Sequence, residues 1–334
     1  MKKKAAKTAK SAKTSKPGLP ASRFAAEQVL RDVQRAIAGK DFASIEELNA
    51  YLAALAGPGL QQSLGDTAPL SPREEAQELA YAAMEARTKE RARTLARRAL
   101  AKDPDCVDAL VIMTGIEAKS PKQAIAGLQK ALTAGERSLG AEFFKENKGH
   151  FWGLMETRSY MRARVELAEL LHMEGLNLDA IQHYEALLEL NPGDNQGVRY
   201  PLLGLYLTVG NLEGARKLLR EFEDDAMATF AWGRVLERVL SGDLAGASVA
   251  LGIARKENRF LEHYLTGQKE MPSQLPDSYS LGSEEEAIVC LDNIGPAWAE
   301  HPDAVPWMVR QLLAEEASKK KEVLSMPKKV RHDP

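Results

Sequence analysis

The chain has 334 residues, of which 44% are hydrophobic and 28% are charged, as in a folded protein with a sizeable core. Its two cysteines, Cys106 and Cys290, lie too far apart for a CxxC motif, and two cysteines cannot build a disulfide framework. The chain also lacks a run of about 18 uncharged apolar residues that could cross a membrane. We therefore expect a cytoplasmic protein with no membrane partner.

Charge is distributed unevenly along the chain. Residues 1–16 carry only positive charges and residues 319–334 carry a net charge of +4, so the overall charge of −2 leaves −13 for residues 17–318. We expect disordered basic tails over 1–20 and 319–334. The first tail lacks the apolar segment of a secretory signal, which also favours the cytoplasm. Its lysines either solubilise the chain or bind nucleic acid or ribosomes; they are Lys2, Lys3, Lys4, Lys7, Lys10, Lys13 and Lys16.

A helical hairpin and a linker are predicted for residues 21–70. Apolar residues recur at helical spacing from Phe24 and stop before Gly39. The sequence SIEE at 44–47 is typical of a capping box that begins a second helix, and Gly57 marks the end of that helix.

Internal repeats are indicated between Ser71 and Asn258, because short glycine turns are repeatedly followed by alanine at the same helical phase. The clearest pair is GNLEGA at 210–215 and GDLAGA at 242–247. One interval between equivalent alanines is longer than the others, which indicates an insertion at about 133–157. The equivalent alanines are Ala92, Ala124, Ala180, Ala215 and Ala247.

This pattern resembles the tetratricopeptide repeat, a helix-turn-helix with small residues where its helices cross and a proline after the second helix. In one unit these positions hold Ala80, Ala92, Ala99 and Pro104, and in another they hold Ala168, Ala180 and Pro192, although Leu187 departs from the pattern. The resemblance implies an all-α fold, a right-handed α-solenoid of about five helix pairs over residues 71–258.

A more specific resemblance covers residues 144–310. It rests on GHFW at 149–152, ETRSYMRAR at 156–164, LNPGDNQGVRY at 190–200 and YSLGSE at 279–284. These segments resemble a group of bacterial tetratricopeptide proteins similar to the suppressor-of-tumorigenicity-seven family, with Ser159 in place of the expected proline. The resemblance implies a helical scaffold with no catalytic residues.

A helical C-terminal cap is predicted for residues 259–318. A Ser-Glu-Glu-Glu capping box begins at Ser283, and Trp298 and Trp307 follow in apolar helical patterns. We expect these tryptophans to cover the last apolar face of the repeats.

No motif for catalysis stands out. None of the six histidines occurs in a metal-binding spacing, and the sequence contains no P-loop, GxGxxG or GxSxG motif. We therefore expect no enzyme, no metal and no cofactor.

In two successive predicted helix pairs, the first helix of the pair begins with arginine and other hydrogen-bonding side chains, on an otherwise acidic body. Arginine suits bidentate binding of a carboxylate or phosphate, so these side chains could form one pocket for an anionic group of a partner. Alternatively, they only cap and brace neighbouring helices. The candidate residues are Arg158, Tyr160, Arg162, Asn195, Gln196, Arg199 and Tyr200.

Phe151 and Trp152 supply aromatic side chains to the insertion. They either form exposed anchors for a partner or fold back into the repeat core.

Stacked helix pairs form an extended concave surface. The sequence therefore predicts a protein-binding scaffold that holds a peptide or a partner helix in this groove. The alternative is a protein associated with nucleic acid or ribosomes through its lysine-rich tails, which would bind with a steep dependence on salt.

Overall fold

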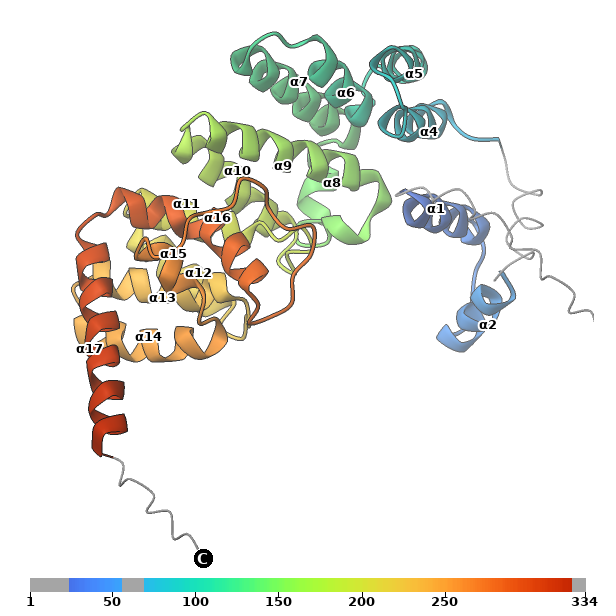
Figure 1. Ribbon diagram of the computed structural model, residues 1–334. Coiled ribbons are helices and arrows are strands. Elements are labelled where there is room, and N and C mark those ends of the chain that lie inside the picture. Colours follow the sequence, from blue (N-terminus) through green and yellow to red (C-terminus); the bar gives the residue numbers. More distant parts are fainter. Residues whose placement is uncertain (1–23, 56–68, 326–334) are drawn as a thin grey trace, which may run out of the picture.

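The computed structural model describes residues 24–55 and 69–325 (Figure 1). This part of the chain consists of helices and the loops between them and forms no strand, which confirms the predicted all-α class. None of its helices is long and apolar enough to span a membrane. The predicted tail at 1–20 lies outside the described residues.

Consecutive helices of the central body pack in pairs, and each pair contacts the next one. The pairs are α4 with α5, α6 with α7, α9 with α10, α11 with α12, and α13 with α14. We call α4, α6, α9, α11 and α13 the first helices. The bounds of the body helices are α4 Pro72–Met84, α5 Lys89–Lys102, α6 Val107–Glu117, α7 Pro121–Leu139, α8 Ala141–Glu146, α9 Arg158–Met173, α10 Asn177–Leu190, α11 Arg199–Thr208, α12 Leu212–Glu221, α13 Ala228–Leu240 and α14 Leu244–Glu257.

Local sequence signals explain where these helices begin. The Ser71 hydroxyl accepts a hydrogen bond from the Glu74 N–H at 3.3 Å, and the Glu74 carboxylate accepts one from the Ser71 N–H at 2.7 Å. This capping box satisfies amides that would otherwise lack a partner at the start of α4. Ser120 caps α7 in a similar way, with its hydroxyl accepting from the Gln123 N–H.

The predicted glycine turns also occur in the structure. Gly210 and Gly242 have φ angles of +70° and +77°, a left-handed conformation that glycine adopts without strain. Asn211 and Asp243 follow them and cap α12 and α14 through their side chains. Each repeat of the GNLEGA type therefore ends one helix and begins the next.

Small residues lie where helices cross closely. Ala180, Ala215 and Ala247 have no exposed surface, whereas Ala92 and Ala124 are partly exposed. The large buried cluster extends from Val107 to Met308, and the α4–α5 pair has a separate core made mostly of alanine.

The predicted insertion contributes to the packed body. Helix α7 continues to Leu139, and α8 and two 3₁₀ turns at Phe151–Gly153 and Met155–Thr157 complete the connection to α9. Phe143 and Phe144 pack against the large cluster.

Both ends of the described chain fold back onto first helices (Figure 1). At the C-terminal end, α16 (Glu284–Glu300) packs against α11 and α13, and it follows the short helix α15 (Leu261–Leu265). Trp298 and Trp307 are 2% and 5% exposed, so both lie in the core. Helix α17 (Ala304–Ser325) continues past residue 318, where the sequence suggested the start of a tail.

At the N-terminal end, α1 (Ala25–Ile37) lies beside α4, and α2 (Ile45–Leu55) contacts α1. The Tyr51 hydroxyl on α2 donates a hydrogen bond to the Ala36 carbonyl of α1 at 3.2 Å. Helix α1 therefore joins the predicted hairpin to the body, and its contacts form the first of two polar clusters.

Candidate functional site

The first polar cluster surrounds the carboxylate of Glu27 on α1. Arg162 on α9 donates two hydrogen bonds to this carboxylate, at 2.7 and 3.0 Å. Arg158, one helical turn earlier, lies 3.6 Å from it. Two arginines that the sequence predicts as anion binders therefore surround a carboxylate that is far away along the chain, 135 residues from Arg162.

Arg162 also connects α1 to the second helix pair. Its guanidinium donates to the Asp108 carboxylate on α6 at 2.7 Å, and the side chain of Asp108 is only 4% exposed. Burial opposes the charge on Arg162, but Asp108 and then Glu27 raise the pKa of its guanidinium above the ordinary value. Arg162 therefore stays charged between these two acids.

Aromatic rings complete this end of the contact. Phe24, just before α1, stacks on Tyr81 of α4 with ring centroids 4.7 Å apart, and the Arg162 guanidinium lies 5.5 Å from the Phe24 ring. The Tyr81 hydroxyl donates a hydrogen bond to Glu27 at 2.7 Å. Burial, together with the Glu27 carboxylate, raises the pKa of Tyr81.

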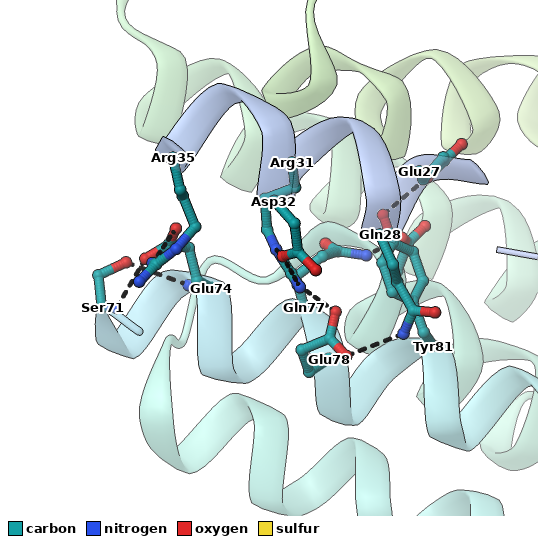
Figure 2. Close-up of polar contacts among 11 residues, drawn as sticks. Glu27, Gln28, Arg31, Asp32, Arg35, Ser71, Glu74, Gln77, Glu78 and Tyr81 are labelled. Atoms are coloured by element: carbon teal, nitrogen blue, oxygen red, sulfur yellow. Dashed lines mark hydrogen bonds and ion pairs between the residues drawn. The ribbon is translucent and has the colours of Figure 1, made fainter. Parts of the chain in front are cut away.

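The rest of α1 pairs with acidic side chains of α4 (Figure 2). Gln28 donates to Glu78 at 2.9 Å, and Arg31 forms an ion pair with the same carboxylate. Arg35 donates to Glu74 at 2.8 Å, in the first turn of α4. Since Glu27 lies at Tyr81 and Arg35 lies at Glu74, α1 runs antiparallel to α4.

The side of α1 that faces the body is mostly polar, whereas Val29 and Leu30 are exposed and Ala36 is buried where α2 makes contact. Val29 is 49% exposed and Leu30 is 44% exposed, and Phe24 is the buried apolar contact with Tyr81. A cavity of about 330 Å³ lies between α1 and the body, lined by side chains that include Glu27 and Arg31. The contact is therefore held mainly by charge and hydrogen bonds.

Tyr160 lies in the core beneath this contact. Its ring packs against Phe144 and Phe151, and the side chain is 1% exposed. The hydroxyl donates to Glu136 at 3.0 Å and accepts a hydrogen bond from Arg164 at 2.6 Å. The structure therefore buries Tyr160 among core residues, where it also lines the cavity that Glu27, Arg31 and Arg162 share.

The two aromatic residues of the insertion lie in different surroundings. Phe151 has no exposed surface, so its ring is folded back into the core. Trp152 is partly exposed, and the Arg158 guanidinium lies 5.0 Å from its ring. Of the two predicted anchors, Trp152 is the one that reaches the surface.

The second polar cluster surrounds Arg199 at the start of α11. Its guanidinium donates to Asp194 at 2.9 Å and to Asp225 at 2.6 Å. Tyr200 donates to the same Asp225 carboxylate at 3.0 Å. This cluster therefore braces the turn before α11 against the segment that follows α12.

Asp194 is central to the turn before α11. It has a φ angle of +45°, and its carboxylate accepts hydrogen bonds from the Val198 and Arg199 amides. Burial raises the pKa of Asp194 above its ordinary value even though these amides and Arg199 favour the charged form. Asn195 beside it is exposed, and the Gln196 side-chain oxygen is buried without a hydrogen-bond partner.

The structure therefore divides the predicted residues between two clusters with different carboxylates. Arg158 and Arg162 share Glu27, and Arg199 and Tyr200 share Asp225. Sequence reasoning missed Glu27, because helical periodicity does not tell which distant helix an exposed acid meets.

One observation on metal ligands and two comparisons with known proteins bear on chemistry and identity. Within residues 24–55 and 69–325, no three His, Cys, Asp or Glu side chains gather as metal ligands would. No protein-family model matches the chain, and no curated protein is significantly similar to it. The tetratricopeptide and suppressor-of-tumorigenicity-seven resemblances therefore stay predictions from the residues.

Proposed function

We propose that the protein is a non-enzymatic scaffold that binds a peptide or helix of a partner on the face of its first helices. The consecutive pairs between α4 and α14 support a right-handed tetratricopeptide-like solenoid of about five pairs, whose first helices line the concave side. The bacterial cytoplasm is its proposed location.

One observation carries this proposal. Arg158 and Arg162 bind the carboxylate of a helix that lies across α4 and α9. This is the chemistry that a scaffold needs to hold an acidic group on a partner's helix, because a guanidinium and a carboxylate form strong charge-assisted hydrogen bonds. The surface is therefore suited to a helix, and the contact of α1 with Arg158 and Arg162 is an example of how a partner's helix would bind.

Affinity capture from a nuclease-treated bacterial lysate tests the proposal. The full chain is compared with Arg158→Ala and with Arg137→Ala, which removes an exposed arginine whose partner is Asp105. We expect a protein that the full chain and Arg137→Ala both retain and that Arg158→Ala loses. A protein retained equally by all three chains would contradict the proposed surface.

The alternative, a nucleic-acid or ribosome partner, depends on lysines outside the described residues. These lysines lie within residues 1–16 and carry the positive charge of that segment. Material that binds only without nuclease, and only while residues 1–16 are present, would favour this alternative.

A further inference from the structure

Helix α1 is attached to the body in an unusual orientation for an amphipathic helix. Amphipathic helices normally bury their apolar side, but Val29 and Leu30 of α1 are exposed, and the apolar residue buried within α1 is Ala36, where α2 makes contact. The polar side makes the contact through Glu27, Arg31 and Arg35. The ion pairs that Arg31 and Arg35 form with α4 join partly exposed charges, so they contribute little stability and are screened by salt.

The body presents a surface with opposite charges at its two ends. Arg158 and Arg162 form the positive end, on α9. Glu74 and Glu78 form the negative end, on α4. A helix that fits this surface carries an acid near its N-terminus and basic residues near its C-terminus, which is the pattern of α1.

The surface does not depend on α1 for its own integrity. When α1 leaves, Arg162 keeps its hydrogen bonds to the buried Asp108, so no buried acid loses its partner. Glu74 keeps its role in the α4 cap through Ser71. The cavity beneath α1 also leaves part of the contact unfilled. Helix α1 can therefore be exchanged without unfolding the body.

We propose that α1 is an exchangeable internal ligand that covers the partner site until a partner's helix replaces it. The partner helix has an aromatic residue, a carboxylate three positions later, and basic residues seven and eleven positions later, as Phe24, Glu27, Arg31 and Arg35 do in α1. This inference rests on the proposed function, and it names the class of partner and the way the site is regulated.

The covalent link between α1 and the body makes the covered state the resting state. A tethered segment competes at an effective concentration of about millimolar, so a free helix of the same sequence at micromolar concentration cannot replace it. A partner must therefore bind more tightly than α1, for example by also filling the cavity beneath α1.

The test uses a fluorescent synthetic peptide that spans residues 21–40 and measures its binding to the full chain by anisotropy. Glu27→Gln in the full chain weakens internal α1 while the peptide keeps its own Glu27. We expect this variant to bind the peptide at least about tenfold more tightly than the original chain does, the effect of losing charge-assisted hydrogen bonds. Asp32→Asn is the matched control, because Asp32 pairs with Arg31 on α1 itself.

A second variant identifies the surface. Adding Arg158→Ala to the Glu27→Gln chain removes a cation that forms an ion pair with Glu27, and should weaken peptide binding by about threefold to fivefold. A peptide that itself carries Glu27→Gln should bind weakly to every chain. Circular dichroism and thermal unfolding confirm that each variant is folded.

Three results would overturn the inference. The first is equal peptide affinity for the original chain and the Glu27→Gln chain. The second is binding that Arg158→Ala does not weaken. The third is a dimer that Glu27→Gln dissociates, since α1 would then occupy the site of a second copy. If Arg158→Ala still abolishes capture of a partner from lysate, the proposed function stands while this inference falls.

Discussion

Gly204 lies where α11 and α16 approach each other closely. A Cβ atom at this position would overlap the backbone carbonyl oxygen of Asn293, which has no flexible end to move away. Because Gly204 has no side chain, α16 can pack closely against α11 at this position. At this residue, a close approach of two backbones requires glycine even though the helix itself would favour alanine.

Gly204→Ala should destabilise the protein by about 1–3 kcal/mol, because an added methyl group has no room. Urea unfolding followed by circular dichroism measures the change. Gly252→Ala is the control, since a Cβ at Gly252 of α14 meets nothing within 4 Å. This control should raise stability by about 0.5–1 kcal/mol, and a loss in both variants would contradict the explanation.

The two cysteine thiols are buried at different places in the fold. Burial raises the pKa of Cys106 to about 12, and burial also raises the pKa of Cys290, whose side chain has no exposed surface. A thiol must ionise and meet its reagent before it reacts. Both residues should therefore be inert in the folded protein.

We expect a disulfide reagent at pH 8 to modify neither cysteine until denaturant is added, and then to modify both. Absorbance of the released thiolate measures the reaction. Rapid modification of Cys106 in the folded chain would show that the N-terminus of α6 opens readily.

At the scale of elements, the first turn of α4 has two roles. The Glu74 carboxylate caps α4 through the Ser71 N–H and also pairs with Arg35 of α1. Burial opposes ionisation of Glu74, but the Ser71 amide and Arg35 outweigh it, so the pKa of Glu74 lies below its ordinary value. One side chain therefore links the start of a helix to the docking of another.

This lowered pKa makes the contribution of Glu74 depend on pH. The folded value lies below the ordinary value of 4.5, so the stabilisation is complete above 4.5 and is lost as pH falls through the folded value. Glu74→Gln should cost about 1 kcal/mol at pH 7 and much less at pH 3, measured by urea unfolding. Glu75→Gln removes an exposed partner of Lys102 and should have a smaller effect at both pH values.

The elements also differ in how well sequence predicted them. Caps and turns are local, so Ser71, Ser120, Gly210 and Gly242 could be recognised from their neighbours in sequence. The sequence also predicted the end of α1 correctly, at Ile37 before Gly39. Its docking could not be predicted, because an amphipathic pattern indicates that the apolar side is buried and α1 is attached by the other side.

The candidate site shows the same limit. The arginines were recognised as anion binders from their chemistry, but the carboxylate beside Arg162 comes from Glu27, far away in sequence. Arg199 meets Asp194, only five residues away, and local bracing of this kind was the alternative to an anion pocket. Partners close in sequence could be anticipated, and partners that depend on tertiary packing could not.

At the scale of the whole molecule, stability is distributed unevenly. The large cluster between Val107 and Met308 contains most of the buried aromatic and leucine side chains, whereas the core of the α4–α5 pair is mostly alanine. Burial of alanine removes less apolar surface from water than burial of leucine does. The N-terminal part of the body is therefore the less stable part.

Hydrogen exchange should follow this order. We expect amides of α1 and α2 to exchange first, those of α4 and α5 next, and those of α11, α13 and α16 last, because local opening is easiest where few apolar groups are buried. Mass spectrometry of peptic fragments measures the order. Uniform protection from α4 to α16 would contradict it.

The position of α16 across α11 and α13 has a mechanical consequence. Helix pairs that touch only their neighbours can be peeled away one at a time under tension. Because α16 binds two first helices at once, the pulling force on either pair is shared with the other. Under load from its two ends, the molecule should release α1 at low force, and the C-terminal pairs should then yield together in one large step.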